Sequence, residues 1–307
     1  MTDTLWTADF ELTGRQVRVK KTGAQVPLDR QTLIGVARWL TLYLPVRARQ
    51  LATSIVPGRP AVWFAPDQPR PWYLIWAAAA WSGVRFADRP EDADAAFYFE
   101  DATHGAPPPA ACARRFNFEC LDISKSRVAE VFETVFGYPL ALDPETHVGL
   151  AVEKGEANGA HDGCVVQCPA PRRPGRVYQR LIHNAEGGAV LDLRTPFVGG
   201  RPVAVFLKRR PADQRFANLN TTVSLARPQE MFSADEIETL SRFAQAMRLD
   251  WGGLDILRDR SNGRLYVVDV NKTDMPPLIL PWTDKLRAVS RLARAFRTLI
   301  SSPDAQP

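Results

Sequence analysis

Cysteine and histidine are scarce in this chain, whose 307 residues include only four of each. Four cysteines are too few to build a disulfide scaffold for a chain of this length, so we expect reduced thiols. The sequence also lacks a long apolar run. The stretch WYLIWAAAAW, residues 72–81, is too short to cross a bilayer, and the first residues, MTDTLWTADFE, carry acids and no apolar run. These absences predict a cytoplasmic protein with no membrane partner.

A complete zinc site is missing as well. His161, Cys164 and Cys168 are spaced like part of a metal-binding cluster, but no fourth ligand lies at a usual zinc spacing. The alternative is that residues 164–168 form a strand in which both thiols face the core. We favour the strand.

The overall composition, 45% hydrophobic and 24% charged, is typical of a soluble globular protein with two or three core-bearing units. The net charge of +5 is a mild basic bias that suits phosphate or acidic ligands as well as nucleic acid. The basic residues form no single stripe interleaved with aromatics, and no internal repeat appears. We therefore expect no nucleic-acid partner, whereas a homodimer remains open.

The order of apolar segments predicts three parts. Residues 1–115 contain two short buried strands, AVWFA and AAFYF, on either side of an apolar helix, which is typical of a small α/β unit. The segment HGAPPPA is the best linker candidate, because consecutive prolines keep a chain extended and cannot join a sheet. The other two parts are expected at 116–182 and 183–307.

Both helix and strand signals occur in these later parts. One helix has Asp122 or Ser124 as its N-cap and ends at Gly137, and another opens with a capping box formed by Ser233 and Glu236. We also expect strands at 147–154, 163–168 and 176–182, a hairpin that turns at Gly199 and Gly200, and a last helix at 283–300.

The most informative segment is GGLDILRDRSNGRLYVVDVNKT, residues 252–273, in which two strand-like runs flank a polar break. A hairpin that turns near Asn262 places Asp255 opposite Asp269, about 5 Å apart, with Asn271 on the same face. Asp259 is expected in the turn, pointing to solvent. Facing carboxylates repel unless a cation lies between them. The segment is therefore either a solvated hairpin face or a magnesium site, whose oxygen ligands leave room for water and substrate phosphates.

A second informative segment, AVEKGEANGAHDG, places Lys154 before a loop with glycines at 155, 159 and 163. Glycines let backbone N–H groups approach an anion, and a lysine adds charge, so the loop can fold over phosphates. The residue order of a Walker loop is absent, and an ordinary hairpin loop is the alternative. The following strand, in VYQRLIHNAE, stops at polar residues, which fits either an adenine-binding strand end or a plain edge strand.

The hairpin at Gly199 and Gly200 carries a group of basic residues. A two-residue turn pairs Asp192 with Leu207, so that Asp192, Arg194 and Arg209 share one face while Lys208 and Arg210 take the other. An arginine beside an aspartate is often only an ion pair. The run of three basic residues at a strand end is more informative, because like charges repel unless an anion or solvent absorbs them.

This order of parts resembles the ATP-grasp superfamily, and within it the ribosomal-protein glutamate ligase and the glutathione synthetase-like carboxylate–amine ligases. The segments DLRTPFVGGRPVAVFLKRR and GGLDILRDRSNGRLYVVDVN are similar to that group's Asp-Ile-Arg and Gly-Val-Asp…Glu-Val-Asn segments, and the similarity covers roughly residues 120–275. The resemblance implies two α+β subdomains that clasp ATP, preceded by a small α/β domain.

The resemblance also implies roles for individual residues. It assigns the metal ions to Asp255, Asp269 and Asn271; the ATP phosphates to Lys154 with Gly155 and Gly159, and to Lys125 as the earlier ATP lysine; adenine to Gln179, Leu181 and Ile182, with Gln179 in place of the usual glutamate; the ribose to Glu186; and the γ-phosphate and acyl phosphate to Arg194, Lys208 and Asn218.

The implied activity is an ATP- and Mg²⁺-dependent ligase, with Mn²⁺ as an alternative metal, that joins a carboxylate to an amine or thiol through an acyl phosphate. An ATP-grasp kinase and a non-catalytic ATP sensor are the alternatives. Two segments depart from the ligases: KTDMPP follows Asn271 where small residues and Pro-Gly are usual, and LNTTVSL replaces paired glycines after RFAN. Both border the acceptor side, so the small-molecule or peptide substrates stay unnamed.

Overall fold

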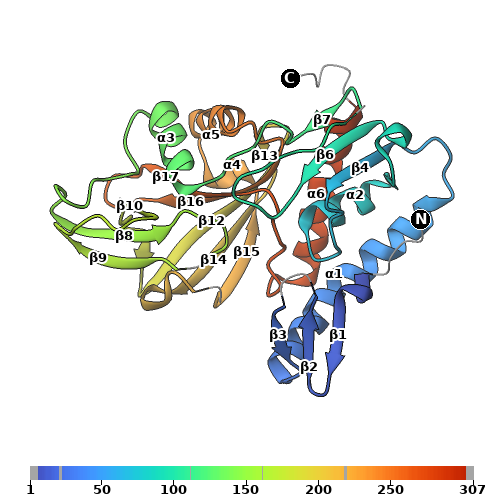
Figure 1. Ribbon diagram of the computed structural model, residues 1–307, viewed down its shortest axis with the longest axis horizontal. Helices are drawn as coiled ribbons and strands as arrows, with labels where there is room; N and C mark the ends of the chain where they lie inside the picture. Colours follow the sequence, from blue (N-terminus) through green and yellow to red (C-terminus); the bar gives the residue numbers. More distant parts are fainter. Residues whose placement is uncertain (1–5, 21–22, 111, 161, 218–219, 302–307) are drawn as a thin grey trace.

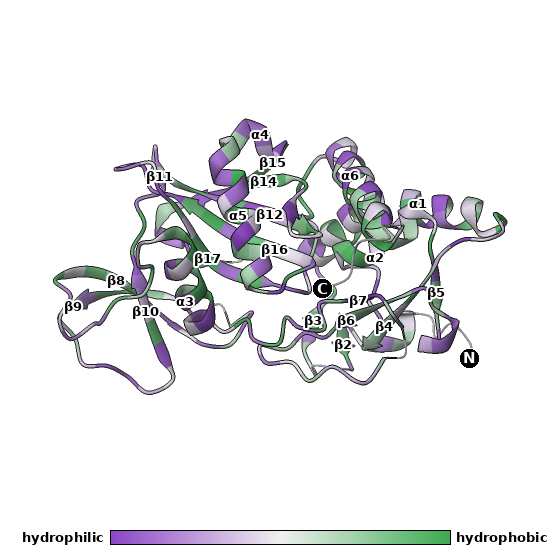
Figure 2. Ribbon diagram, turned by 90° about the horizontal axis from the view of Figure 1, so that it is seen from above, coloured by the Kyte–Doolittle hydropathy of each residue, from purple (hydrophilic) through white to green (hydrophobic). Residues whose placement is uncertain are grey.

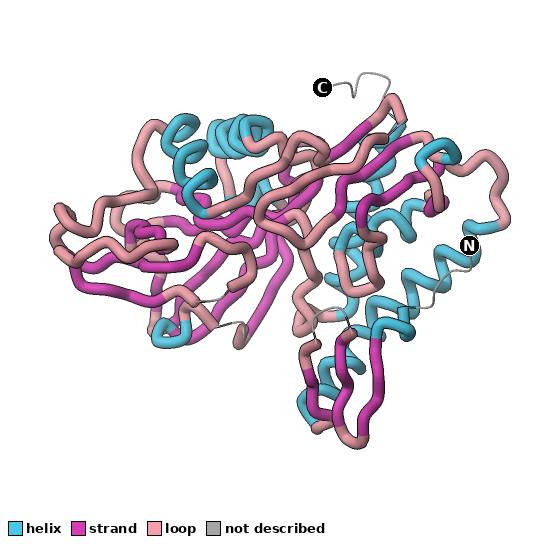
Figure 3. The backbone as a smooth tube through the Cα atoms, viewed as in Figure 1, coloured by secondary structure: helices cyan, strands magenta, loops and turns pink. Residues whose placement is uncertain are grey.

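The computed structural model describes residues 6–20, 23–110, 112–160, 162–217 and 220–301, and it opens with elements that the sequence analysis did not predict. A short 3₁₀ turn leads into a small antiparallel sheet, which the long helix α1 (Arg30–Ser54) follows. Asp29 caps α1 by accepting a hydrogen bond from Thr32 N at 2.8 Å. The sheet projects away from the larger sheets (Figures 1 and 3). Its elements are η1 (Trp6–Asp9), β1 (Phe10–Thr13), β2 (Gln16–Val19) and β3 (Gln25–Pro27).

A four-stranded parallel sheet confirms the small α/β unit predicted from AVWFA and AAFYF. Helix α2 (Leu74–Ser82) and the C-terminal helix α6 (Trp282–Ser301) lie side by side against it (Figures 1 and 2). Phe296 of α6 stacks on Phe97 with 5.1 Å between ring centroids, and it meets Trp251 edge-on. The last helix thus packs with the N-terminal sheet, while the boundaries at 115 and 182 stay a prediction. The remaining elements, with the strands in sheet order, are β5 (Arg85–Ala87), β4 (Ala61–Pro66), β6 (Ala95–Phe99), β7 (Arg115–Phe116) and η2 (Pro90–Asp92).

A small antiparallel sheet follows the linker, in the order β10-β8-β9, and helix α3 (Lys125–Phe136) precedes it. Ser124 is the N-cap of α3 and Gly137, at a φ of 76°, is its C-cap, so both predicted ends are confirmed. Cys168 is buried, but Cys164 is exposed, so the prediction that both thiols face the core is wrong for Cys164. The strands are β8 (Gly149–Gly155), β9 (Cys164–Cys168) and β10 (Arg176–Arg180).

The largest sheet is antiparallel and has the order β15-β14-β12-β16-β17, with β11 and β13 paired to β12. Helices α3 and α5 (Ala234–Ala246) cover one face, where apolar side chains of the sheet meet Phe132 and Phe243 (Figure 2). The predicted capping box of Ser233 and Glu236 is present at the start of α5. The other elements are β11 (Ala185–Glu186), β12 (Ala189–Val198), β13 (Arg201–Pro202), β14 (Val205–Pro211), η3 (Ala212–Gln214), β15 (Thr222–Ala226), α4 (Pro228–Met231), β16 (Trp251–Arg258) and β17 (Leu265–Asn271).

The basic hairpin turns at Gly199 and Gly200 as predicted, but its register shifts by one residue. Next to the turn the pairing is that of a two-residue turn. Beyond an interruption at 203–204, Asp192 pairs with Lys208 and not with Leu207. The predicted grouping of side chains is therefore wrong: Lys208 and Arg210, and not Arg209, share the face of Asp192 and Arg194.

The acidic hairpin pairs Asp255 with Asp269, as predicted, although for a partly different reason. Close to the turn, Arg258 pairs with Leu265, one residue out of the predicted register. A bulge at Val268 inserts an extra residue into β17 and brings the two aspartates opposite each other.

Asp259 does not point to solvent, so that prediction is wrong. Its side chain is buried, and the carboxylate accepts hydrogen bonds from Ser261 N at 2.8 Å and Ser261 Oγ at 2.6 Å. Asp259 thus closes the turn through its own side chain. No helix among the described residues combines the length and apolarity that a membrane span requires.

We predict that Phe296→Ala lowers the free energy of unfolding by about 3–5 kcal/mol, because it removes a fully buried ring and leaves a cavity between α6 and the parallel sheet. Urea unfolding measures the loss. The exposed neighbour Arg294 is the control, and Arg294→Ala should stay within about 0.5 kcal/mol of wild type. Equal losses in both variants would contradict the packing of α6.

Candidate functional site

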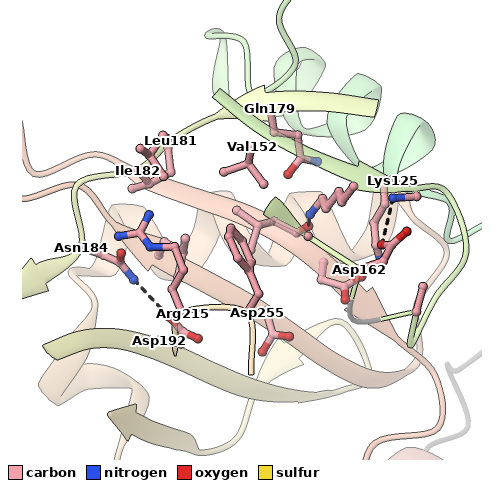
Figure 4. Close-up of a pocket in the computed structure, with 18 of the residues that line it drawn as sticks. Lys125, Val152, Asp162, Gln179, Leu181, Ile182, Asn184, Asp192, Arg215 and Asp255 are labelled. Carbon is pink, nitrogen blue, oxygen red and sulfur yellow. Dashed lines mark hydrogen bonds and ion pairs between the residues drawn. The ribbon is translucent and has the colours of Figure 1, made fainter. Parts of the chain in front are cut away.

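A cavity of about 240 Å³ lies between the small sheet and the largest sheet (Figure 4). Helix α3, strands β8 and β10, the glycine-rich loop and the facing strands β12, β14, β16 and β17 all contribute side chains to it. Most of the site residues predicted from the sequence line this cavity: Lys125, Lys154, Gly155, Gly159, Gln179, Leu181, Ile182, Lys208, Asp255 and Asp269. Arg194, Glu186 and Asn271 do not line it, and Asn218 lies outside the described residues.

Each of the two facing carboxylates has its own cation. Lys125, at the first turn of α3, donates from Nζ to Asp269 Oδ1, and its side chain is only 6% exposed. Arg194 donates from Nη1 to Asp255 Oδ2 at 2.8 Å. Burial opposes ionisation of Asp255, but the charges of Arg194 and Lys208 outweigh it and hold the pKa of Asp255 below its usual value. Each of the two carboxylates therefore has a cationic partner within the protein itself.

The hydrogen bond of Lys154 depends on the bulge in β17. Its Nζ donates to the carbonyl of Val268 at 2.8 Å, and Val268 is the extra residue that has no partner in the strand pairing. Burial lowers the pKa of Lys154 to about 8, although the charge of Asp269 opposes the shift. Lys154 therefore holds its proton more weakly than a free lysine, and an anion bound in the cavity would strengthen that hold.

A second ionic group lies in the same sheet as the facing carboxylates, on β12 and β14. Asp192 accepts from Arg210 Nη2 and from Asn184 Nδ2, the latter at 3.0 Å (Figure 4). Burial raises the pKa of Asp192 to about 6, against the charge of Arg210, and burial lowers the pKa of Lys208. The one-residue register shift brings these groups together, and the sequence analysis had separated them.

The far end of the cavity is more apolar. Leu181, Ile182 and Val152 lie there, and the carboxamide of Gln179 points toward the cavity from β10 (Figure 4). Gln179 is buried, and its Nε2 has no hydrogen-bond partner. A buried amide without a partner is costly unless a ligand supplies one, so this end suits a flat ring with polar edges.

The structure does not bring Glu186 to this end of the cavity. Its exposed carboxylate pairs with Arg260 at 2.8 and 2.9 Å. Asn184, two residues earlier, lines the cavity instead, and the sequence analysis missed it together with Asp192. β10 ends at Arg180. The polar residues that follow in the sequence, which include Asn184, were the available signal for the cavity-lining role of Asn184.

The glycine-rich loop is fixed by specific contacts. Gly155 N donates to Asp162 Oδ1 at 3.1 Å, and Asp162 also pairs with Arg176. At Gly163 a Cβ atom would come within 2.8 Å of the Phe216 ring, so only glycine permits this approach. Figure 4 shows Asp162 on the same side of the cavity as Lys125.

The donor set suits Mg²⁺ rather than a softer metal. Asp255 and Asp269 offer hard carboxylate oxygens from neighbouring strands. Asn271 Oδ1 accepts hydrogen bonds from Thr273 N at 2.8 Å and Thr273 Oγ1 at 3.1 Å, so its amide oxygen is already engaged. No three His, Cys, Asp or Glu residues in the described part of the chain gather into a metal site. Two carboxylates fit an ion that keeps water and substrate phosphates among its ligands.

Comparison with solved structures identifies the fold. The ATP-grasp ligase PsnB, complexed with a minimal precursor, matches with a TM-score of 0.50 and 13% identity over 78% of this chain and 97% of PsnB. A RimK-domain ATP-grasp protein from Sphaerobacter thermophilus gives a TM-score of 0.45 at 13% identity, covering 79% of this chain and 100% of that one. The D-alanine–D-alanine ligase of Bacillus anthracis gives 0.45 at 11%, covering 79% and 97%.

Sequence comparison adds no nearer relative: no protein-family model matches the chain, and no curated protein matches it. The structural match to PsnB, together with the arrangement of the two sheets around one cavity, establishes an α+β ATP-grasp fold. The predicted fold is therefore confirmed, and the resemblance to ATP-grasp proteins holds at the level of the fold.

The lowered pKa of Lys154 predicts a pH dependence of stability. The folded protein holds this proton more weakly than the unfolded chain, so the charged form costs stability below pH 8, and the cost disappears as the pH rises from about 8 to 10.5. Compared with Lys154→Met, wild type should gain about 1–2 kcal/mol over that window. Urea unfolding of both proteins across the window measures the difference. A difference that does not change with pH would contradict the burial of Lys154.

Proposed function

We propose that the protein is an ATP- and Mg²⁺-dependent ligase that joins a carboxylate to an amine through an acyl phosphate. One observation carries the proposal: a single cavity between the two sheets of an ATP-grasp fold contains two facing carboxylates and three lysines, each from a different element. Carboxylates suit Mg²⁺, and clustered lysines suit the phosphates that accompany it. The lysines are Lys125 on α3, Lys154 on β8 and Lys208 on β14.

In this proposal the nucleotide lies along the cavity with its base between the strands at the apolar end. Gln179 and the backbone of Leu181 and Ile182 read the base, and Asn184 takes the ribose end in place of Glu186, which points elsewhere. The glycine-rich loop covers the phosphates, with Gly155 and Gly159 allowing close approach.

The proposed reaction has two steps, and negative charge on the phosphate group has to be stabilised in both. The substrate carboxylate forms a bond to the γ-phosphorus of ATP while the bond to the β,γ-bridging oxygen breaks, which gives an acyl phosphate and ADP. The amine nitrogen then bonds to the acyl carbon, phosphate leaves, and the amine loses a proton. Bound at Asp255 and Asp269, Mg²⁺, or Mn²⁺ as an alternative, would supply Lewis-acid stabilisation of the phosphates. The three lysines hold the negative charge of the transferred group in a water-poor cavity.

The two joined substrates are a carboxylate and an amine on small molecules or peptides. The structure of PsnB contains a precursor, and this is the support for including peptides. The segments 272–277 and 220–225, which depart from the pattern of the ligases, border this side of the site in the proposal.

We predict that Asp269→Asn separates ligand binding from folding. Without nucleotide, the variant loses the partner of buried Lys125, so its melting temperature should fall. With Mg-ATP in about 100-fold excess over Kd, wild type should gain about 3 kcal/mol of stability, and the variant should gain much less. Thermal unfolding with and without Mg-ATP measures both effects. Asp235→Asn, on the exposed start of α5, is the control and should behave like wild type. Full Mg-ATP stabilisation of Asp269→Asn would overturn the metal assignment.

The reaction class is tested by product analysis. With Mg-ATP, pooled amino acids and cell extract, a ligase releases both ADP and inorganic phosphate. An ATP-grasp kinase releases ADP and leaves the phosphate on its product, and a nucleotide sensor releases neither. We expect ADP and phosphate in equal amounts, and release of ADP alone would contradict the proposal.

A further inference from the structure

The segment after Asn271, which departs from the pattern of the ligases, is buried and fixed on several sides. Its first three side chains are each exposed by 5% or less. It contacts the N-terminal sheet, the start of α2 and the chain just before α3. Lys272 Nζ donates to the Cys120 carbonyl at 3.2 Å and lies 4.8 Å from the centroid of the Tyr98 ring. Thr273 Oγ1 donates to Asp101 Oδ1 at 3.0 Å, and Leu74 N donates to the Asp274 carbonyl at 2.8 Å.

Asp274 in this segment accepts two hydrogen bonds from Arg194. Its Oδ1 accepts from Arg194 Nε at 3.0 Å and from Nη2 at 2.7 Å, while Nη1 of the same guanidinium donates to Asp255 Oδ2 at 2.8 Å. Both Asp274 and Arg194 are buried. Burial opposes the charge of Arg194, but the two aspartates outweigh it and raise the pKa of Arg194 above its usual value. Arg194 is therefore a permanent cation bridging two carboxylates.

The backbone of β16 is shaped for this ion pair. At Gly253 a Cβ atom would collide with Asp274 Oδ2 and lie 2.8 Å from Arg194 Nε. Any side chain at this position would push the aspartate and the guanidinium apart. The strand that carries Asp255 thus also makes room for the pair that holds it.

We propose that Arg194 and Asp274 are positioning residues for Asp255: Asp274 fixes the guanidinium, and the guanidinium fixes the carboxylate that receives Mg²⁺. This inference rests on the proposed function. It gives Arg194 a different role from the phosphate contact that the family resemblance implies, and it agrees with the absence of Arg194 from the residues that line the cavity. It also gives a task to Asp274, which has no counterpart in the Pro-Gly segment usual in the ligases.

The two roles of Arg194 predict opposite effects of Asp274→Asn. The variant keeps the size of the side chain and its acceptor oxygen but removes one negative charge. If Arg194 acts through Asp255, its charge then falls more fully on that carboxylate, and Mg²⁺ binds more weakly. If Arg194 contacts phosphate, loss of its partner leaves it a stronger cation, and the nucleotide binds more tightly.

The experiment is a Mg²⁺ titration of thermal stability at fixed ADP, which avoids turnover. We expect Asp274→Asn to raise the half-saturating Mg²⁺ concentration by about tenfold. Asp274→Ser, which is smaller and also uncharged, should shift it in the same direction. The control is Asp9→Asn, which breaks a comparable two-point pair with Arg70 far from the cavity and should leave the Mg²⁺ dependence unchanged. An unchanged or lowered half-saturating concentration in the Asp274 variants overturns the proposal.

A crystal structure of wild type with Mg²⁺ and ADP or a non-hydrolysable ATP analogue supplies a second test that needs no variant. Arg194 should remain between Asp255 and Asp274, and a guanidinium turned onto a phosphate oxygen would overturn the proposal. The failure of this inference is distinct from failure of the proposed function, because in the latter case wild type itself would show no stabilisation by Mg²⁺ and nucleotide.

Discussion

Two carboxylates that face each other on neighbouring strands have to be balanced, and the cations that balance Asp255 and Asp269 come from distant parts of the chain. Lys125 reaches Asp269 from the first turn of α3, and Arg194 reaches Asp255 from β12. Because each carboxylate has its own cation, the repulsion between the two is offset within the protein itself. The two ion pairs that offset the repulsion also connect α3 and β12 to the hairpin, and both elements contribute to the cavity.

The sequence carried much of this arrangement because its strongest signals are local. The hairpin pattern around Asn262, the helix caps and the glycine positions depend on neighbouring residues, and they predicted the hairpin and both ends of α3, while the pairing of Asp255 with Asp269 also requires the bulge at Val268. The family resemblance then predicted that two sheets face each other across the nucleotide site, which no local sequence pattern indicates. Ten of the predicted site residues line one cavity, although they are spread along the chain from Lys125 to Asp269.

The errors have a common physical origin in single-residue register changes and in long-range ion pairs. An interruption at 203–204 moves Lys208 and Arg210 to the face of Asp192, and a bulge at Val268 provides the carbonyl that Lys154 contacts. Turn residues alone do not reveal such irregularities, because the strands absorb them where side-chain packing demands. The contact between Arg194 and Asp274 could not be predicted from local patterns either, because the two residues lie 80 residues apart in the chain.

The segment 272–274 adds a physical link between the N-terminal sheet and the candidate site. Its lysine and threonine are held by Tyr98, Cys120 and Asp101, and its aspartate holds Arg194. A shift of the parallel sheet relative to the hairpin would therefore have to break buried ionic contacts or carry Arg194 with it, because a buried charge cannot be left without a partner. The segment thus connects the N-terminal sheet to Asp255 through an unbroken series of contacts, from Asp101 and Tyr98 through residues 272–274 to Arg194.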